Sequence, residues 1–239
     1  MIEVRGVSKV FRLPHERRRT LFHRLFPRGR AYERFFALTD VSLSVEAGEF
    51  VALVGANGSG KSTLLRVVAG IYPPSTGTVQ VAGAVAPILE LGVGFQGPLT
   101  VRDNVVLYGV LLGVPRRRLR EELPAILQRA GVARFADARL DALSTGLRAR
   151  LAFTLALLAS APVLLIDEAL AVGDEAFRRR CIDELLALRS AGRTLLFVSH
   201  SLSLVETLCS RVVIMEAGRV RADGTPGEMI PLYHSLSNR

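Results

Sequence analysis

Hydrophobic and polar positions divide this chain into two kinds of segment. Continuous apolar runs occur at FVALV (50–54), VLLID (163–167) and TLLFVSH (194–200). Such runs are typical of strands buried on both faces of a parallel sheet. A helical segment, AFRRRCIDELLALRSAG (176–192), separates the last two. Strands that alternate with helices predict an α/β fold with a doubly wound, mostly parallel sheet.

The regions around these runs predict further elements. Residues 37–55 give an alternating strand, a tight turn and the first buried strand. Residues 98–130 predict mostly helix. The tail at 211–224 predicts a β-hairpin, and the capping box TPGE then starts a helix at Pro226.

Another helix is predicted after Ser144, whose hydroxyl can cap it. Its apolar side chains share one face and include Leu151, Leu155 and Leu158. The length of 239 residues suits one α/β domain over 1–239. Within it we distinguish an arginine-rich insert at 12–34, a helical subdomain at 98–160, and a C-terminal hairpin and helix at 211–239.

The segment VALVGANGSGKST (51–63) carries the first candidate chemistry. Its spacing is G-x-x-x-x-G-K-[ST], in which glycines let successive N–H groups point into one concavity at the start of a helix. Lys61 is predicted to contact the β- and γ-phosphates of a nucleotide, and Ser62 to offer a hydroxyl to Mg²⁺. The predicted binding residues of this phosphate loop are Gly55, Asn57, Gly58, Ser59, Gly60, Lys61, Ser62 and Thr63.

Two adjacent carboxylates end the second apolar run. Asp167 follows four apolar residues and is predicted to lie at the carboxyl edge of the sheet, where ligands bind in such folds. We expect it to hold Mg²⁺ through water, with Ser62 as a direct ligand. Glu168 turns to a different side and is predicted to act as the base that polarises the attacking water.

Composition bounds the setting of this site. Net charge is +9, the isoelectric point is about 10.6 and mean hydropathy is +0.32. The basic balance favours an anionic partner such as nucleotide, nucleic acid or a membrane face. The longest apolar stretch, 151–166, is interrupted by Pro162 and is shorter than the ~20 residues of a membrane-spanning helix. We therefore expect a cytosolic protein, with Cys181 and Cys209 as reduced packing residues.

Further motifs follow in order along the chain. They are FQGPLTVRDNV with Gln96, LSTGLRARLAF with Ser144 and Gly146, ALAVGD ending in Asp174, and LLFVSH ending in His200. In this order the sequence resembles the nucleotide-binding domain of ABC transporters over most of its length. Thr145 and Leu147 depart from the usual L-S-G-G-Q signature. With LELGVGF, DEALAVGD and FFALTDVS, this departure resembles the ATPase subunits that export O-antigen, capsule and teichoic acid polymers.

The resemblance implies roles for these residues. Two nucleotide-binding subunits pack head to tail as a homodimer, and Ser144, Gly146 and Asp174 of one complete the ATP site of the other. His200 contacts the γ-phosphate, and Gln96 links metal and water to the helical subdomain. Phe11 occupies the position that stacks on adenine, although Phe22, Tyr32 and Phe35 are near it in sequence.

The resemblance also implies the setting. ATP and Mg²⁺ are the expected cofactors, and two separate transmembrane permease subunits are the expected partners. The subunit is expected at the cytoplasmic face of the inner membrane, peripherally bound, with a lipid-linked polysaccharide as cargo and without nucleic acid.

Three other functions compete with polysaccharide export. The nearest is the ATPase subunit of a drug or lipid exporter, which the arginine-rich insert and ALAVGD disfavour. A nucleic-acid-associated ABC ATPase usually carries coiled-coil or zinc insertions, and neither heptads nor a cysteine cluster occurs in the sequence. A non-catalytic nucleotide switch would lack Glu168 or His200, and both are present.

The arginine-rich insert predicts a contact of its own. In LFHRLF, the apolar residues Leu21, Phe22, Leu25 and Phe26 share one helical face. We expect a short amphipathic helix whose basic side meets anionic headgroups or the phosphates of the cargo. The alternative is a solvated lid over the nucleotide domain.

Overall fold

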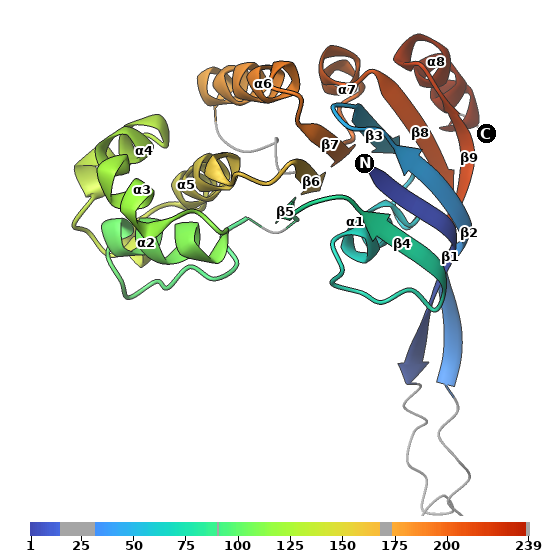
Figure 1. The fold of residues 1–239 in the computed structure, drawn as a ribbon, viewed down its shortest axis with the longest axis horizontal. Coiled ribbons are helices and arrows are strands. Elements are labelled where there is room, and N and C mark those ends of the chain that lie inside the picture. The colour runs from blue at the N-terminus through green and yellow to red at the C-terminus, as the bar shows by residue number, and fades with distance from the viewer. Residues whose placement is uncertain (15–31, 90, 168–173, 238–239) are drawn as a thin grey trace, which may run out of the picture.

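The computed structural model describes residues 1–14, 32–89, 91–167 and 174–237. The amphipathic helix predicted in the arginine-rich insert, and the predicted base Glu168, lie outside these residues. The two ends of the insert are described, and both are strand: Arg12 pairs with Arg34 in an antiparallel ribbon. This ribbon projects from the body of the molecule (Figure 1).

The central sheet has six strands in the order β5-β6-β7-β3-β8-β9. Neighbours from β5 to β8 run parallel, and β9 is antiparallel at the edge. The strands are β3 (Phe50–Val54), β5 (Val85–Ile88), β6 (Val163–Asp167), β7 (Thr194–Val198), β8 (Arg211–Glu216) and β9 (Arg219–Gly224). All five residues of β3 and of β7 are buried, which confirms the prediction made from their apolar runs.

A second sheet of three antiparallel strands lies beside the first. Its order is β2-β1-β4, with β1 at Ile2–Pro14, β2 at Tyr32–Val45 and β4 at Thr76–Val81. Helix α1 (Lys61–Val68) shares one hydrophobic core with both sheets, since Leu64 and Leu65 are fully buried in the same cluster as residues of β1, β2 and β3. This packing holds the start of α1 against the end of β3.

Helices α6 (Glu175–Ser190), α7 (Leu202–Leu208) and α8 (Pro226–Ser237) cover the other face of the central sheet (Figure 1). Half of the capping box predicted before α8 is present: Glu228 Oε2 accepts from Thr225 N–H at 3.1 Å. Thr225 Oγ1 donates to the same carboxylate oxygen at 2.8 Å, and Glu228 N–H bonds to the backbone oxygen of Thr225 instead of to this hydroxyl. The hairpin of β8 and β9 precedes it, as predicted.

The helical subdomain lies at one end of the molecule (Figure 1) and joins the core of the central sheet through its last helix. It consists of α2 (Val101–Leu111), α3 (Arg116–Glu121), α4 (Leu123–Arg129), α5 (Thr145–Leu158) and two 3₁₀ turns, Ala133–Phe135 and Leu140–Ala142. It has its own apolar cluster, to which α2, α4 and α5 contribute. The expectation that 98–130 is mostly helical is confirmed.

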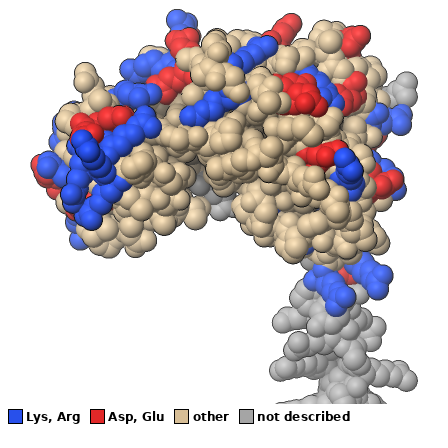
Figure 2. Space-filling view, viewed as in Figure 1, with Lys and Arg blue, Asp and Glu red and all other residues tan. Residues whose placement is uncertain are grey.

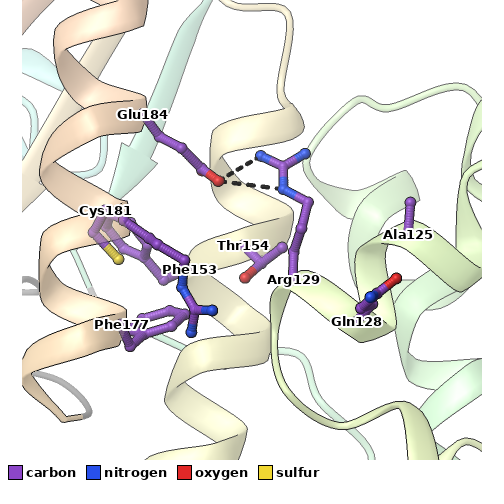
Figure 3. Close-up of a pocket in the computed structure, with 9 residues that line it drawn as sticks. Ala125, Gln128, Arg129, Phe153, Thr154, Phe177, Cys181 and Glu184 are labelled. Carbon is purple, nitrogen blue, oxygen red and sulfur yellow. Dashed lines mark hydrogen bonds and ion pairs between the residues drawn. The ribbon is translucent and has the colours of Figure 1, made fainter.

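A cavity of about 280 Å³ lies where the helical subdomain meets the core (Figure 3). Phe153 of α5 and Phe177 of α6 line it, and their ring centroids are 6.5 Å apart. Arg129 of α4 reaches across to Glu184 of α6, with Nη2 and Nε at 2.7 and 3.2 Å from Oε1. An ion pair beside this cavity therefore links the helical subdomain to α6.

Candidate functional site

The phosphate loop turns sharply because its glycines adopt backbone angles that other residues rarely take. Gly55, Gly58 and Gly60 have φ of 153°, 79° and 103°. A Cβ on Gly55 would lie 2.3 Å from the carbonyl oxygen of Met215, and one on Gly60 would lie 2.7 Å from that of Ala37. Glycine is required at both positions because neighbouring backbone leaves no room for a side chain.

Lys61 lies folded across this loop. Its side chain is almost fully buried, and Nζ donates to the carbonyl oxygens of Gly55 and Ala56 at 2.8 and 2.9 Å. Ser62 and Thr63 follow in the first turn of α1, half-buried. The ammonium group is thus held over the mouth of the loop, within reach of an anion that settles there.

The start of α1 is suited to that anion. Its N-cap is Gly60, which provides no capping side chain, and no acidic residue occupies the first turn. The first N–H groups of a helix have no partner within the helix, and they carry a partial positive charge. The residues present therefore fit the phosphates of a nucleotide.

Three neighbouring strands of the central sheet bring two further predicted site residues to the edge of the sheet where the phosphate loop lies. Asp167 ends β6 opposite Val198 of β7, and Val198 is also opposite Leu53 of β3. His200 comes two residues after β7 and is exposed. Asp167, His200 and the phosphate loop therefore leave adjacent strands at their carboxyl ends, as predicted from the sequence.

Gln96 lies in the loop that leads into the helical subdomain, with its side chain exposed. Its backbone is fixed by Asn104 of α2, a fully buried residue for which the sequence alone predicts no role. Asn104 Oδ1 accepts from Gln96 N–H at 2.7 Å, and Nδ2 donates to Gln96 O at 2.9 Å. Nδ2 also lies 2.9 Å from Thr100 O and 3.3 Å from Leu99 O. The short polar stretch TVRDNV carries this residue, but only the fold shows that it is buried.

Ser144 and Gly146 occupy the exposed N-terminus of α5. Ser144 Oγ accepts from Leu147 N–H at 3.3 Å, which confirms the predicted cap. No atom lies within 4 Å of a Cβ built on Gly146. Helices α5 and α1 lie in different parts of the molecule (Figure 1). One chain therefore does not bring the signature residues to its own phosphate loop.

Asp174 has two partners within its own chain. Its Oδ1 caps α6 by accepting from Phe177 N–H at 2.9 Å, and Oδ2 lies 2.9 Å from Arg150 Nη2 of α5. The hydrogen bond from Phe177, followed by that from Arg150, holds the pKa of Asp174 below its usual value. The carboxylate thus ties the signature helix to α6. Its contact with a second chain stays a prediction.

Phe11 packs edge-on against Tyr72, with ring centroids 5.5 Å apart. Lys9 Nζ lies 5.2 Å from the Phe11 centroid. Lys9 is opposite Leu38, whose Cδ2 would be 2.9 Å from a Cβ on Gly60. The ribbon of β1 and β2 therefore passes beside the phosphate loop, and adenine stacking on Phe11 stays a prediction.

Known proteins are similar to this chain both in sequence and in fold. Residues 38–171 match the ABC transporter family. The chain belongs to the ABC transporter family. Its curated relatives include the O-antigen export system ATP-binding protein RfbB of Klebsiella pneumoniae, 39% identical over 98% of this chain and 97% of that protein.

Two other relatives of this ABC family member are similar over most of its length. The ABC transporter protein AbcA of Aeromonas salmonicida is 39% identical over 99% of this chain and 76% of its own length. The teichoic acids export ATP-binding protein TagH of Listeria monocytogenes serotype 4b is 34% identical over 97% of this chain and 69% of its own length.

Solved structures show the same ABC fold. A dimeric ATP-binding cassette in a post-hydrolysis state bound to ADP and Pi superposes with a TM-score of 0.77 at 22% identity, covering 95% of this chain and 99% of that one. An ATP-binding subunit of an ABC transporter gives 0.77 at 24% identity, covering 98% and 93%. The predicted fold class, family and ATP hydrolase activity are confirmed. No described helix of this ABC chain is both long and apolar enough to cross a membrane.

Proposed function

We propose that this ABC subunit binds and hydrolyses ATP to drive export of a lipid-linked polysaccharide, of the O-antigen, capsule or teichoic acid type, through a separate transmembrane subunit. One observation carries the choice of cargo. The similarity to an O-antigen export ATP-binding protein extends over 98% of this chain and 97% of that protein. It therefore includes the regions outside the nucleotide motifs that a drug or lipid exporter subunit need not share.

The described residues suit this chemistry. Lys61 and the N–H groups of the phosphate loop bind the β- and γ-phosphates. Ser62 and Asp167 offer the oxygen ligands that Mg²⁺ prefers, and Gln96 adds an amide oxygen. When bound, Mg²⁺ would neutralise charge on the phosphates. His200 leaves the strand beside Asp167 and can contact the γ-phosphate, while Glu168 stays the predicted base.

The catalytic unit we propose is a head-to-tail homodimer with two equivalent sites. Each chain exposes Ser144 and Gly146 at a helix N-terminus, a location suited to phosphate, yet holds them apart from its own phosphate loop. A second copy related by a twofold axis would supply them in trans.

The surface beside Gln96 suits the transmembrane partner. Val93, Val110 and Leu111 are 65%, 47% and 64% exposed there. A groove of about 640 Å³ lies beside α2 and α3, and its lining includes Leu107, Val110 and Leu123 together with Arg102, Arg116, Arg120 and Asp103. An apolar patch beside three arginines and one aspartate fits an amphipathic segment of a membrane subunit that carries mostly acidic side chains.

A peripheral place at the cytoplasmic membrane face follows from this partner. Lys and Arg side chains also gather over the outer end of the helical subdomain (Figure 2), where α3 reads RRRLRE. Arg12 and Arg34 are exposed at the base of the arginine-rich insert. Near an anionic surface each such residue contributes ~1 kcal/mol of attraction.

Two experiments test this function. Deleting the gene in its own cell should remove polysaccharide from the surface and make the lipid-linked polymer accumulate inside. The wild-type gene should reverse both effects, and Lys61→Ala should reverse neither. Unchanged surface polysaccharide in the deletion strain would contradict the proposed cargo.

The dimer is tested by mixing variants. Lys61→Ala disables one half of a composite site and Ser144→Arg disables the other. Mixed dimers of the two should regain one working site and about a quarter of wild-type activity in a one-to-one mixture, from random pairing. No recovery at any mixing ratio would show that each site is completed within one chain.

A further inference from the structure

The turn between β8 and β9 is a two-residue hairpin loop. Glu216 pairs with Arg219, which leaves Ala217 and Gly218 between them. Both have positive φ, 46° and 76°. Two successive left-handed residues define the type I′ turn, whose twist matches that of the flanking strands. The turn therefore has a fixed shape, which includes the direction of the Gly218 N–H group.

The hairpin of β8 and β9 contacts the phosphate loop at three points. Gly218 N–H donates to the carbonyl oxygen of Ser59 at 3.0 Å. Gly218 Cα would lie 3.4 Å from a Cβ on Gly60, and Met215 O approaches Gly55 closely. Strand β2 holds the turn in place, because Thr39 N–H donates to Gly218 O at 2.8 Å. Gly218 thus connects β2 to the loop through one residue.

Part of the loop borders a cavity instead of packed atoms. A cavity of about 270 Å³ is lined by residues 55–59 of the loop, by residues 214–217 of the hairpin, and by Tyr233 and Leu236 of α8. A loop that borders a cavity is stabilised by fewer contacts than one packed on all sides. The hydrogen bond from Gly218 is therefore one of the few contacts that fix the conformation of the loop, together with those from Lys61 Nζ to Gly55 O and Ala56 O.

We propose that Gly218 is a positioning residue for nucleotide binding, which acts through the Ser59–Gly60 peptide. The peptide is trans, so its C=O and N–H point in opposite directions. With the carbonyl of Ser59 bound to Gly218 on the outer side, the N–H of Gly60 is directed toward the inner side of the loop. This inference rests on the proposed function, in which that side holds the phosphates.

The position admits only glycine. A Cβ on Gly218 would lie 2.8 Å from the carbonyl oxygen of Ala37 and 3.2 Å from Leu38 Cα. Gly218→Ala must therefore move the turn away from β2, and the Ser59 carbonyl loses its partner. Losing one well-directed N–H to a charged phosphate should raise the KM and the Kd for ATP about tenfold or more, and kcat at saturating ATP should fall less than threefold.

Gly192→Ala is the matched control. Gly192 also has positive φ, 77°, but no atom lies within 4 Å of a Cβ built there, and it lies between α6 and β7. The Gly192→Ala variant should carry the same backbone strain as Gly218→Ala and keep the wild-type KM for ATP. Equal KM values for the two variants would overturn the proposal, whereas absence of ATP binding by the wild type would instead contradict the proposed function.

Hydrogen exchange of the wild-type chain tests the same idea should Gly218→Ala not fold. Saturating Mg²⁺ and a non-hydrolysable ATP analogue should slow exchange of the Gly218 amide at least severalfold, because the bound phosphate stabilises the loop to which this N–H is bonded. The Gly192 amide, bonded to Arg189 O, should not change. Unchanged exchange at Gly218 would overturn the proposal.

Discussion

Replacing Asn104 by Ala should destabilise the chain far more than its polar character suggests. The residue is fully buried, and its amide makes three hydrogen bonds of 2.9 Å or less, to Gln96 N–H, Gln96 O and Thr100 O. Each contributes a net ~1 kcal/mol, and the backbone groups left behind are costly when unsatisfied. We expect a loss of about 3 kcal/mol in the free energy of unfolding. Because the same bonds fix the Gln96 backbone, ATPase activity should fall at temperatures where the variant is still folded.

Urea unfolding followed by circular dichroism measures this loss. Gln128→Ala is the control, since it truncates an exposed amide side chain in the same subdomain and should change stability by less than ~0.5 kcal/mol. Asn104→Asp keeps the acceptor but removes both donors and buries a carboxylate, so it should be at least as harmful. A loss below ~1 kcal/mol for Asn104→Ala would refute the reasoning, because it would mean that water replaces the amide at little cost.

Other expectations concern the predicted base, the thiols and the turn. Glu168→Gln should bind ATP but lose ~10²-fold or more in turnover, whereas Lys61→Ala should lose binding as well; more than about a tenth of wild-type turnover in Glu168→Gln would contradict its role as base. Burial raises the pKa of Cys181 and Cys209 to about 12, so native protein at pH 8.5 should react slowly with a thiol-specific disulfide reagent and rapidly only in urea. Because these pKa values are raised, their contribution to stability should be full below about pH 8.5 and decline as pH rises toward 12, which urea titrations across that range would detect. Ala217→Asn should stabilise the chain by ~0.5–1 kcal/mol, since asparagine tolerates the left-handed conformation better than alanine; a lower unfolding midpoint would show that the turn tolerates no larger side chain.

The sequence predicts the buried strands and the phosphate loop well because each depends on a local pattern. FVALV and TLLFV are apolar throughout, so their burial does not depend on knowing their neighbours. The G-x-x-x-x-G-K-[ST] spacing and the capping residues Ser144 and Thr225 are likewise local. Each of these features can be recognised from about ten consecutive residues.

What the sequence does not predict depends on contacts between distant segments. The ribbon that pairs Arg12 with Arg34 shows no alternation of polar and apolar residues, so the sequence does not predict that the ends of the insert are strands. The burial of Asn104, the ion pair of Asp174 with Arg150 and the bond from Gly218 to Ser59 join separate elements. No local spacing marks such pairs. The capping role of Asp174 could have been inferred, because an aspartate just before a helix commonly fills it.

The strand order also decides when this chain can fold during synthesis. β3 lies between β7 and β8, so Leu53 pairs with Val198 and with Val213, about 150 residues later in the sequence. Until the ribosome has added both partners, a fully apolar strand exposes two unpaired edges, which invite association with other chains. The nucleotide loop at the end of β3 therefore acquires its shape only after β7 and β8, residues 194–216, have been synthesised, and fragments that stop before residue 194 should aggregate rather than bind ATP.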